Sequence, residues 1–273
     1  MNPRLRATVL AALCVVVAYA AYRLVVHVRA PVIPAIVTRD MDAHRALSRD
    51  PLARVDRFLH DRPPSDRSSW PKLVALTFDD GPYPVDTPLL LDVLADLNVK
   101  ATFFLIGRDA EQFPELTQRI EREGHEIANH TLTHPNLDQL DDAGVERELQ
   151  EGKAALTALA PDPAISTMMR PPHGRFTEET VRVAQRAGYD VILWNDDPGD
   201  WRSVTAGDLE RHIAAHATAP DIVLLHSGRP ATIAMLPSLV ARFRGAGFDF
   251  VTVGELLRRA PAGVIDHPER HPV

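Results

Sequence analysis

The stretch Leu73–Pro82 reads LVALTFDDGP, and it decides the fold. Residues 73–78 are apolar apart from Thr77, which is typical of a short strand buried on both faces. Two adjacent carboxylates, Asp79 and Asp80, follow directly, and Gly81–Pro82 then turns the chain. Adjacent carboxylates repel each other unless a cation or another partner relieves them. Taken alone, the stretch fits a solvated turn equally well, because Asp and Gly are common in turns.

Short apolar runs and longer helical patterns alternate from this stretch onward. This alternation predicts an α/β fold, a parallel sheet or barrel with helices outside, whose ligands bind beyond the carboxyl ends of the strands. Thr87, followed by Pro88, is expected to cap the first helix. The expected strands are 73–78, 101–106, 126–129, 167–170, 191–194, 222–225 and 248–252. The helices are expected at 88–97, 114–124, 141–159, 178–187, 205–217, 233–246 and just before residue 259.

Length and charge bound the function. A chain of 273 residues is long enough for one barrel-sized domain with short extensions. The net charge of −7 disfavours binding to nucleic acid, which depends on basic residues. The single cysteine, Cys14, excludes an intramolecular disulfide and a cysteine metal site.

The N-terminus has the pattern of an export element. Arg4 and Arg6 precede an apolar stretch over 7–28, about the length needed to span a bilayer. We expect a signal-anchor at 1–28, with cleavage near Ala20 as the alternative. Both put the rest of the chain outside the cytoplasm, because the arginines stay inside. A stem (29–70), a catalytic domain (71–260) and a tail (261–273) complete the predicted organisation, and we expect a monomer.

Histidines follow the third expected strand, in the segment HTLTHP at 130–135. His130 and His134 are four residues apart, a spacing that lets two imidazoles face one metal. Pro135 disfavours helical geometry at His134, so the pair belongs to a turn at a strand end. The pairs at 212/216 and 267/271 have the same spacing but follow no strand with a carboxylate partner. We interpret the first as helix-face residues and the second as tail.

Three later strand ends also hold unusual polar residues. One of them begins with Arg170. A buried arginine needs an anion, and the carboxylate pair after the first strand would suit it. Five polar segments at successive strand ends favour one shared site over five unrelated loops. The three later segments are RPPHG at 170–174, WNDDPGDW at 194–201 and LLHSG at 224–228.

These segments together resemble the polysaccharide deacetylase family, the NodB-type esterases of carbohydrate esterase family four. The resemblance runs from about residue 72 to residue 259 and implies a distorted, incomplete (β/α) barrel. The most specific motifs are TFDDGP and HTLTHP. ATFFLIG at 101–107 and GHEIANH at 124–130 are also similar to the family.

The resemblance implies a role for each polar residue. Asp80, His130 and His134 would bind one divalent metal, zinc in the first place, with cobalt or another divalent ion as alternatives. Asp79 would be the general base that deprotonates the water activated by the metal, and Arg170 would hold it in place. His226 would be the general acid, oriented by Asp200, which raises its pKa.

The resemblance also implies a substrate pocket. Trp201 and Leu224 would wall the space for the acetyl methyl group, and the backbone N–H of His173 would stabilise the oxyanion with the metal. His173 stands where the family usually has tyrosine. If only its N–H serves the reaction, the change costs little, whereas a side chain that contacts sugar would alter substrate preference.

The function expected from these residues is hydrolysis of N-acetyl groups on an extracytoplasmic polysaccharide, such as peptidoglycan or chitin-like oligomers. Two alternatives stay open. One is an esterase that removes O-acetyl groups from xylan or another glycan, because the same site could cleave esters. The other is a metal-containing sugar-binding protein without turnover.

Overall fold

The computed structural model describes residues 71–160, 165–217 and 219–260. The predicted signal-anchor, stem and tail, and the 267/271 histidine pair, therefore lie outside the described residues. Within the described ranges, no helix combines the length and the apolar character that crossing a bilayer requires.

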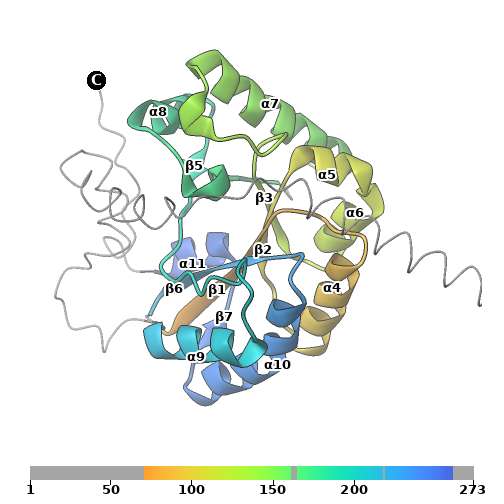
Figure 1. Cartoon of the computed structure of the whole chain (residues 1–273), viewed down its shortest axis with the longest axis vertical. Helices are drawn as coiled ribbons and strands as arrows, with labels where there is room; N and C mark the ends of the chain where they lie inside the picture. The colour runs from red at the N-terminus through yellow and green to blue at the C-terminus, as the bar shows by residue number, and fades with distance from the viewer. Residues whose placement is uncertain (1–70, 161–164, 218, 261–273) are drawn as a thin grey trace, which may run out of the picture. The chain divides into compact units, whose positions relative to one another are not determined.

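The described part of the chain is built on one parallel sheet (Figure 1). Its strand order is β5-β4-β3-β2-β1-β6, and β7 pairs with the start of β1. The central strand β1 has all seven residues buried, as its apolar sequence predicts. The strands are β1 (Leu73–Asp79), β2 (Thr102–Leu105), β3 (Glu126–Asn129), β4 (Ile165–Met169), β5 (Asp190–Val191), β6 (Asp221–His226) and β7 (Asp249–Phe250).

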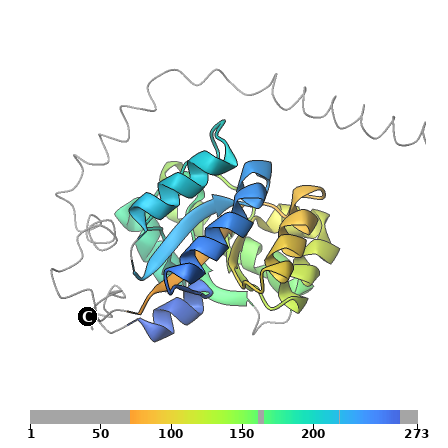
Figure 2. The ribbon, with the colours of Figure 1, turned by 90° about the horizontal axis from the view of Figure 1, so that it is seen from below.

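Helices connect successive strands and cover the outside of the curled sheet (Figures 1 and 2). They are α4 (Asp86–Asp96), α5 (Gly107–Gln112), α6 (Pro114–Arg122), α7 (Asp142–Leu159), α8 (Glu178–Arg186), α9 (Ala206–His216), α10 (Pro230–Gly245) and α11 (Val253–Arg259). Two short 3-10 helices, η2 (Leu137–Gln139) and η4 (Pro172–Gly174), follow β3 and β4.

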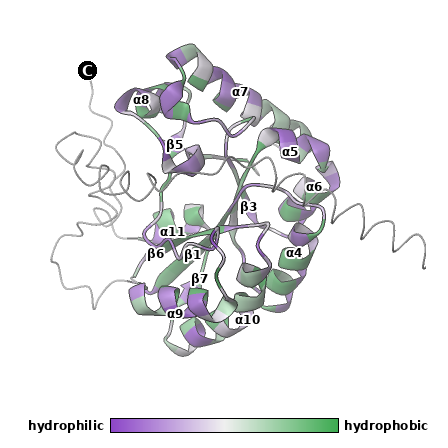
Figure 3. Ribbon diagram, viewed as in Figure 1, coloured by the Kyte–Doolittle hydropathy of each residue, from purple (hydrophilic) through white to green (hydrophobic). Residues whose placement is uncertain are grey.

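Two apolar layers hold the barrel together. Alternate residues of β1, such as Val74 and Leu76, pack outward against leucines of α4 and against α9 and α10. The intervening residues, such as Leu73 and Ala75, point inward with Phe104 and Ile222. Figure 3 shows that the helices carry hydrophilic residues on the side away from the sheet. Burial on both sides is the reason the strands read as continuous apolar runs.

The structure confirms the predicted alternation of strands and helices, and it changes some boundaries. Thr87 does not cap its helix: α4 begins at Asp86, and the Thr87 hydroxyl accepts a hydrogen bond from the Tyr83 N–H. Helix α5 (GRDAEQ) was not predicted, because its six residues have no apolar periodicity. Strand β5 has two residues instead of the four predicted, and β7 has two instead of five.

The barrel closes only partly between β5 and β6. Beyond β5, one isolated bridge joins Asp196 to Val223 of β6. We call this junction, where residues 192–200 run along β6, the seam. The seam gives the barrel the incomplete character that the family resemblance implies.

Candidate active site

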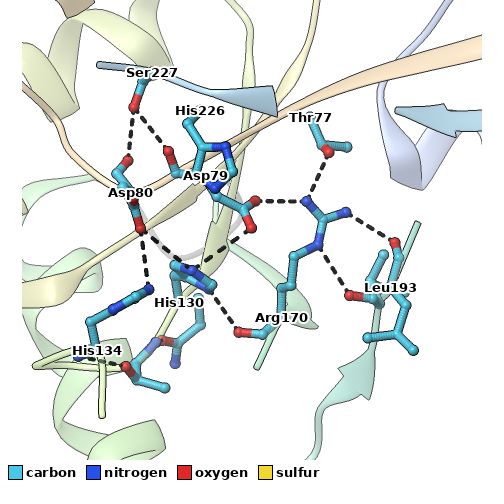
Figure 4. A network of polar contacts seen from close by, with 12 residues as sticks. Thr77, Asp79, Asp80, His130, His134, Arg170, Leu193, His226 and Ser227 are labelled. Carbon is cyan, nitrogen blue, oxygen red and sulfur yellow. Dashed lines mark hydrogen bonds and ion pairs between the residues drawn. The ribbon is translucent and has the colours of Figure 1, made fainter. Parts of the chain in front are cut away.

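The polar residues picked out by sequence gather at the carboxyl ends of four strands (Figure 4). Asp79 ends β1, His226 ends β6, and these two residues are direct partners in the β1–β6 register. His130 follows β3 and Arg170 follows β4. Because carboxyl ends of parallel strands meet at one edge, segments as far apart in sequence as Asp79 and His226 form a single site.

Sharp backbone turns aim these side chains. Asp80 and Gly81 have φ values of 67° and 71°, so the chain reverses as soon as β1 ends. A Cβ on Gly81 would lie 2.9 Å from the Ser227 hydroxyl, which itself donates to the Asp79 and Asp80 carbonyls. His134 also has a positive φ, 61°. Left-handed backbone at residues other than glycine costs free energy and is concentrated at functional sites.

Asp80, His130 and His134 come together as the sequence predicts. The Asp80 Oδ1 lies 3.2 Å from the His134 Nε2 and 3.7 Å from the His130 Nε2. One potential ligand atom from each residue lies within 4.8 Å of the other two. The Asp80 Oδ1 is buried and has no hydrogen-bond partner among the residues that the structure describes. A buried carboxylate oxygen facing two imidazole nitrogens fits a divalent cation with open coordination positions.

The two histidines are held in the form that a metal requires. The His130 Nδ1 lies 2.8 Å from the Arg170 carbonyl, so it carries the proton and leaves the Nε2 lone pair facing Asp80. Burial lowers the pKa of His130, and burial together with His173 lowers the pKa of His134 to about 4. Both imidazoles are therefore neutral near pH 7, as metal ligands must be.

Arg170 holds Asp79. Its side chain is fully buried, and its Nη1 donates to the Asp79 Oδ1 at 2.6 Å and to the Thr77 hydroxyl at 2.8 Å. Its other nitrogens donate to the Ile192 and Leu193 carbonyls at 3.2 and 3.0 Å. Burial lowers the pKa of Arg170, and the Asp79 charge opposes that shift. The pairing fixes one Asp79 oxygen, while the other lies 3.8 Å from the His130 Nε2, at the edge of the candidate metal site.

His226 faces the site from the neighbouring strand and is tied to Asp200. The His226 Nδ1 lies 2.7 Å from the Asp200 Oδ1, and the His226 N–H donates to the Asp200 Oδ2 at 2.8 Å. Thr232 of α10 donates to the same Oδ2 at 2.7 Å. Burial lowers the pKa of His226, but the hydrogen bond and charge of Asp200, helped by Asp79 and Asp80, outweigh it and raise the pKa overall.

Of the three predicted pocket residues, His173 contacts the candidate metal cluster. His173 in η4 has a φ of 58°, and its ring meets the His134 ring edge-on at 4.5 Å between centroids. Leu224 is buried on β6, two residues before His226 and on the same side of the strand. Trp201 is 43% exposed, with the Arg202 guanidinium 4.4 Å from its ring.

Sequence reasoning missed three supporting residues. Thr77 lies two residues before Asp79 on the same side of β1, so period-two alternation could have found it. Nothing in the sequence connects Thr232 with Asp200, since they meet only when α10 packs against the loop. The 212/216 pair lies on α9 as interpreted, but His212 also bonds to Asp196 at 2.9 Å, which was not foreseen.

Comparison with known proteins agrees with this geometry. The family model described as polysaccharide deacetylase matches residues 66–192. A peptidoglycan-N-acetylglucosamine deacetylase of Bacillus cereus is 38% identical over 192 residues, covering 68% of this chain and 89% of the relative. The chain belongs to the polysaccharide deacetylase family. A chitooligosaccharide deacetylase of Sinorhizobium fredii is also 38% identical, over 69% of this chain and 84% of its own length.

Solved structures of this deacetylase family share the fold. The Bc1960 peptidoglycan N-acetylglucosamine deacetylase has a TM-score of 0.66 and 34% identity, covering 68% of this chain and 88% of its own. A mutant of BA3943, a CE4 family pseudoenzyme with restored enzymatic activity, has a TM-score of 0.65 and 29% identity over 68% of each chain. Since the fold includes a pseudoenzyme, turnover has to be argued from the residues of this chain.

Proposed function

We propose that this polysaccharide deacetylase removes N-acetyl groups from an extracytoplasmic polysaccharide, peptidoglycan or chitin-like oligomers, with the help of one divalent cation. The observation that carries the proposal is the placement of Asp79 and His226 as register partners at the ends of adjacent strands, beside the Asp80–His130–His134 cluster. The names of the relatives, a peptidoglycan-N-acetylglucosamine and a chitooligosaccharide deacetylase, support the class of substrate.

Asp80, His130 and His134 are the residues that would hold the cation, with zinc proposed first. When bound there, a divalent cation acts as a Lewis acid that polarises the acetyl carbonyl and acidifies a neighbouring water. The buried Asp80 Oδ1, which accepts no hydrogen bond from the described residues, and the two neutral imidazoles fit such an ion. These ligands accept several divalent ions, so the identity of the metal is a matter for measurement.

Asp79 and His226 would move the protons. Asp79 takes the proton from the attacking water, because Arg170 holds one of its oxygens and leaves the other free toward the site. His226 gives its proton to the departing nitrogen, and Asp200 keeps it protonated and oriented for that step. The peptide N–H of His173 would donate to the developing oxyanion, while Leu224 and Trp201 would bound the space for the methyl group.

Release of acetate by the full chain tests the proposal. The substrates are peptidoglycan, chitooligomers and acetylated xylan, each assayed after chelation and again after zinc or cobalt is restored. We expect acetate and free amine from the first two substrates, and loss of activity on chelation. Free hydroxyl from xylan alone would favour an O-acetyl esterase, and binding without acetate from any substrate would favour a sugar-binding protein.

We also propose that residues 7–28 anchor the chain in the cell membrane with the catalytic domain outside the cytoplasm, and that it acts as a monomer. The basic start and apolar run of the sequence support the anchor. Fractionation of cells producing the full chain tests it. The protein should pellet with membranes and be accessible to protease added outside the inner membrane. Release as a soluble protein shortened by about twenty residues would indicate cleavage near Ala20 instead.

A further inference from the structure

A buried carboxylate is hydrogen-bonded to a histidine at the seam of the barrel, outside the groups assigned to catalysis. The Asp196 side chain is 3% exposed, and its Oδ1 lies 2.9 Å from the Nε2 of His212 on α9. Its other oxygen, Oδ2, is buried and accepts no hydrogen bond from the described part of the chain. His212 is 38% exposed, so the pair joins a buried carboxylate to an imidazole at the surface. Asp196 thus depends on one neighbouring side chain for its hydrogen bonding.

The pair sits in the middle of a segment whose two ends serve the site. At one end, Arg170 donates to the Ile192 and Leu193 carbonyls. At the other end, Asp200 accepts hydrogen bonds from the ring and the backbone of His226. The partners of both proton-transfer residues therefore contact the seam between residues 192 and 200.

The backbone at the seam is also bonded directly to β6, because the Asn195 and Asp196 N–H groups donate to the Ile222 carbonyl at 2.9 and 3.3 Å. Strand β5 ends at Val191, and Asp196 makes the isolated bridge to β6, with its carbonyl accepting from the Leu224 N–H at 2.9 Å. Only a tight turn separates Asp196 from Asp200, closed by the Asp197 side chain on the Gly199 N–H at 2.9 Å. A displacement at Asp196 would therefore pass along a short, stiff link to Asp200.

We propose that Asp196 and His212 are positioning residues that fix the seam and thereby keep Asp200 against His226. The pair touches no reacting atom in this arrangement, and its effect on rate rests on the proposed function. The physical reason is the cost of burying a lone charge. Without the imidazole, the buried Asp196 oxygen loses its hydrogen-bond donor, and the carboxylate is stabilised by taking up a proton or by moving toward water. We propose that it moves and draws the Asp196 backbone away from β6.

Replacement of His212 by alanine tests the proposal in the full chain. We expect kcat for acetate release to fall roughly ten-fold, with KM within about two-fold, as for other residues that orient catalytic groups. His212→Gln should restore most of the rate, because its amide N–H can reach Asp196. The matched control is Arg211→Gln, which removes an exposed basic side chain of the same helix whose ion pair is with Asp208, and it should leave kcat unchanged.

A second readout does not depend on substrate. The Nδ1–H proton of His226, hydrogen-bonded to Asp200, should give a downfield NMR signal in histidine-labelled wild type and in His212→Gln. It should weaken or shift in His212→Ala. If wild type releases no acetate but this signal responds as described, the proposed function fails and the positioning role stands.

Three results would overturn the positioning role. One is an unchanged kcat and an unchanged His226 signal in His212→Ala, even if that variant melts at a lower temperature. Another is the same loss of rate in Arg211→Gln. Should His212→Ala not fold, His212→Asn, whose side chain is too short to reach Asp196, replaces it. Failure of both to fold while His212→Gln folds would show that the pair supports the whole domain instead.

Discussion

At the amino ends of the strands, His125 and Glu126 border a hollow of about 550 Å³, whereas at the carboxyl ends Asp79, Asp80 and His130 surround the candidate active site. Both ends contain buried histidines and carboxylates. At the amino ends, the Ala101 N–H donates to the His125 Nδ1 at 3.2 Å. Glu126 accepts from the Thr102 hydroxyl and the Gly254 N–H at 2.8 and 3.0 Å. These bonds attach one strand or loop to the next.

The carboxyl ends differ chiefly in how the backbone is bent. Of the five described residues other than glycine with positive φ, four lie there, namely Asp80, Thr131, His134 and His173, and Asn98 lies at the amino ends. Among the described residues, a buried carboxylate oxygen without a hydrogen-bond partner occurs at both ends, Asp80 Oδ1 and Glu123 Oε2, but only the first faces two imidazole nitrogens. Clustered left-handed backbone therefore distinguishes the site better than the size of a hollow does. We expect changes at the carboxyl ends to alter the reaction, with or without a loss of stability, and changes at the amino ends to alter stability alone.

The largest effect is expected from Asp79→Asn. The amide cannot accept the proton from water, so acetate release should fall by roughly 10³-fold or more. Metal content measured after dialysis should stay equal to that of wild type, because Asp79 is not among the three candidate ligands. A variant that retains a tenth of the wild-type rate would show that Asp79 is not the base. Loss of the metal along with the rate would place Asp79 among the ligands.

Arg170→Met should destabilise the fold itself. Its buried guanidinium satisfies Asp79, Thr77 and two carbonyls, and methionine leaves all four without that partner. Leaving a buried carboxylate unpaired costs about 3–5 kcal/mol of unfolding free energy. Denaturant titration by circular dichroism measures this cost. Arg182→Met is the matched control, since Arg182 forms its ion pairs on the exposed face of α8 and its loss should leave the stability nearly unchanged. Equal stability of both variants would contradict the role given to Arg170.

The sequence predicted the strands that end in the site because their signals are local. An apolar run such as 73–78 needs only its own residues to indicate a buried strand. The rule that carboxyl ends of parallel strands meet at one edge predicted that these segments share a site. The choice of Asp80 as the metal ligand with His130 and His134, and of Asp79 as the partner of Arg170, came from the family resemblance.

Other features depend on packing that no local pattern encodes. The contacts Thr232–Asp200 and His212–Asp196 join residues 32 and 16 positions apart, through helices that dock on the loop after β5. The shortness of β5 was missed as well. Residues 191–194 contain apolar side chains suited to a strand, but their backbone turns toward Arg170 and β6 rather than extending the ladder to β4.

Asp200→Asn should weaken the general acid without moving it. The oxygen of the asparagine amide can still accept the bonds from the His226 N–H and from Thr232. The amide NH₂ then faces the His226 Nδ1, and the negative charge that favours the imidazolium form of His226 is gone. Because the pKa of His226 is raised, wild type should stay active above the ordinary histidine pKa. It should lose activity as pH rises through the raised pKa. In the variant, this loss should move to lower pH, and kcat should fall by roughly one to two orders of magnitude. An unchanged alkaline limb would mean that another group is the acid.

His125→Asn addresses the amino ends and should have the smallest effect. The His125 side chain is 1% exposed, and burial, with smaller contributions from Lys100 and Arg119, lowers its pKa from 6.5 to about 4. A histidine whose folded pKa is depressed contributes stability above pH 6.5, and that stability is lost as pH falls toward 4. Between pH 7 and pH 5 the loss amounts to about 2 kcal/mol.

Asparagine does not titrate in this range, and its carbonyl can still accept from the Ala101 N–H. The variant should therefore lose about 1–2 kcal/mol less stability than wild type between pH 7 and pH 5, measured by denaturant titration without added metal. Acetate release at pH 7 should match wild type, because His125 lies at the opposite ends of the strands from Asp79. Equal acid sensitivity of the two proteins would show that His125 is already charged when buried. A lower rate at pH 7 would contradict the prediction that changes at the amino ends of the strands alter stability alone.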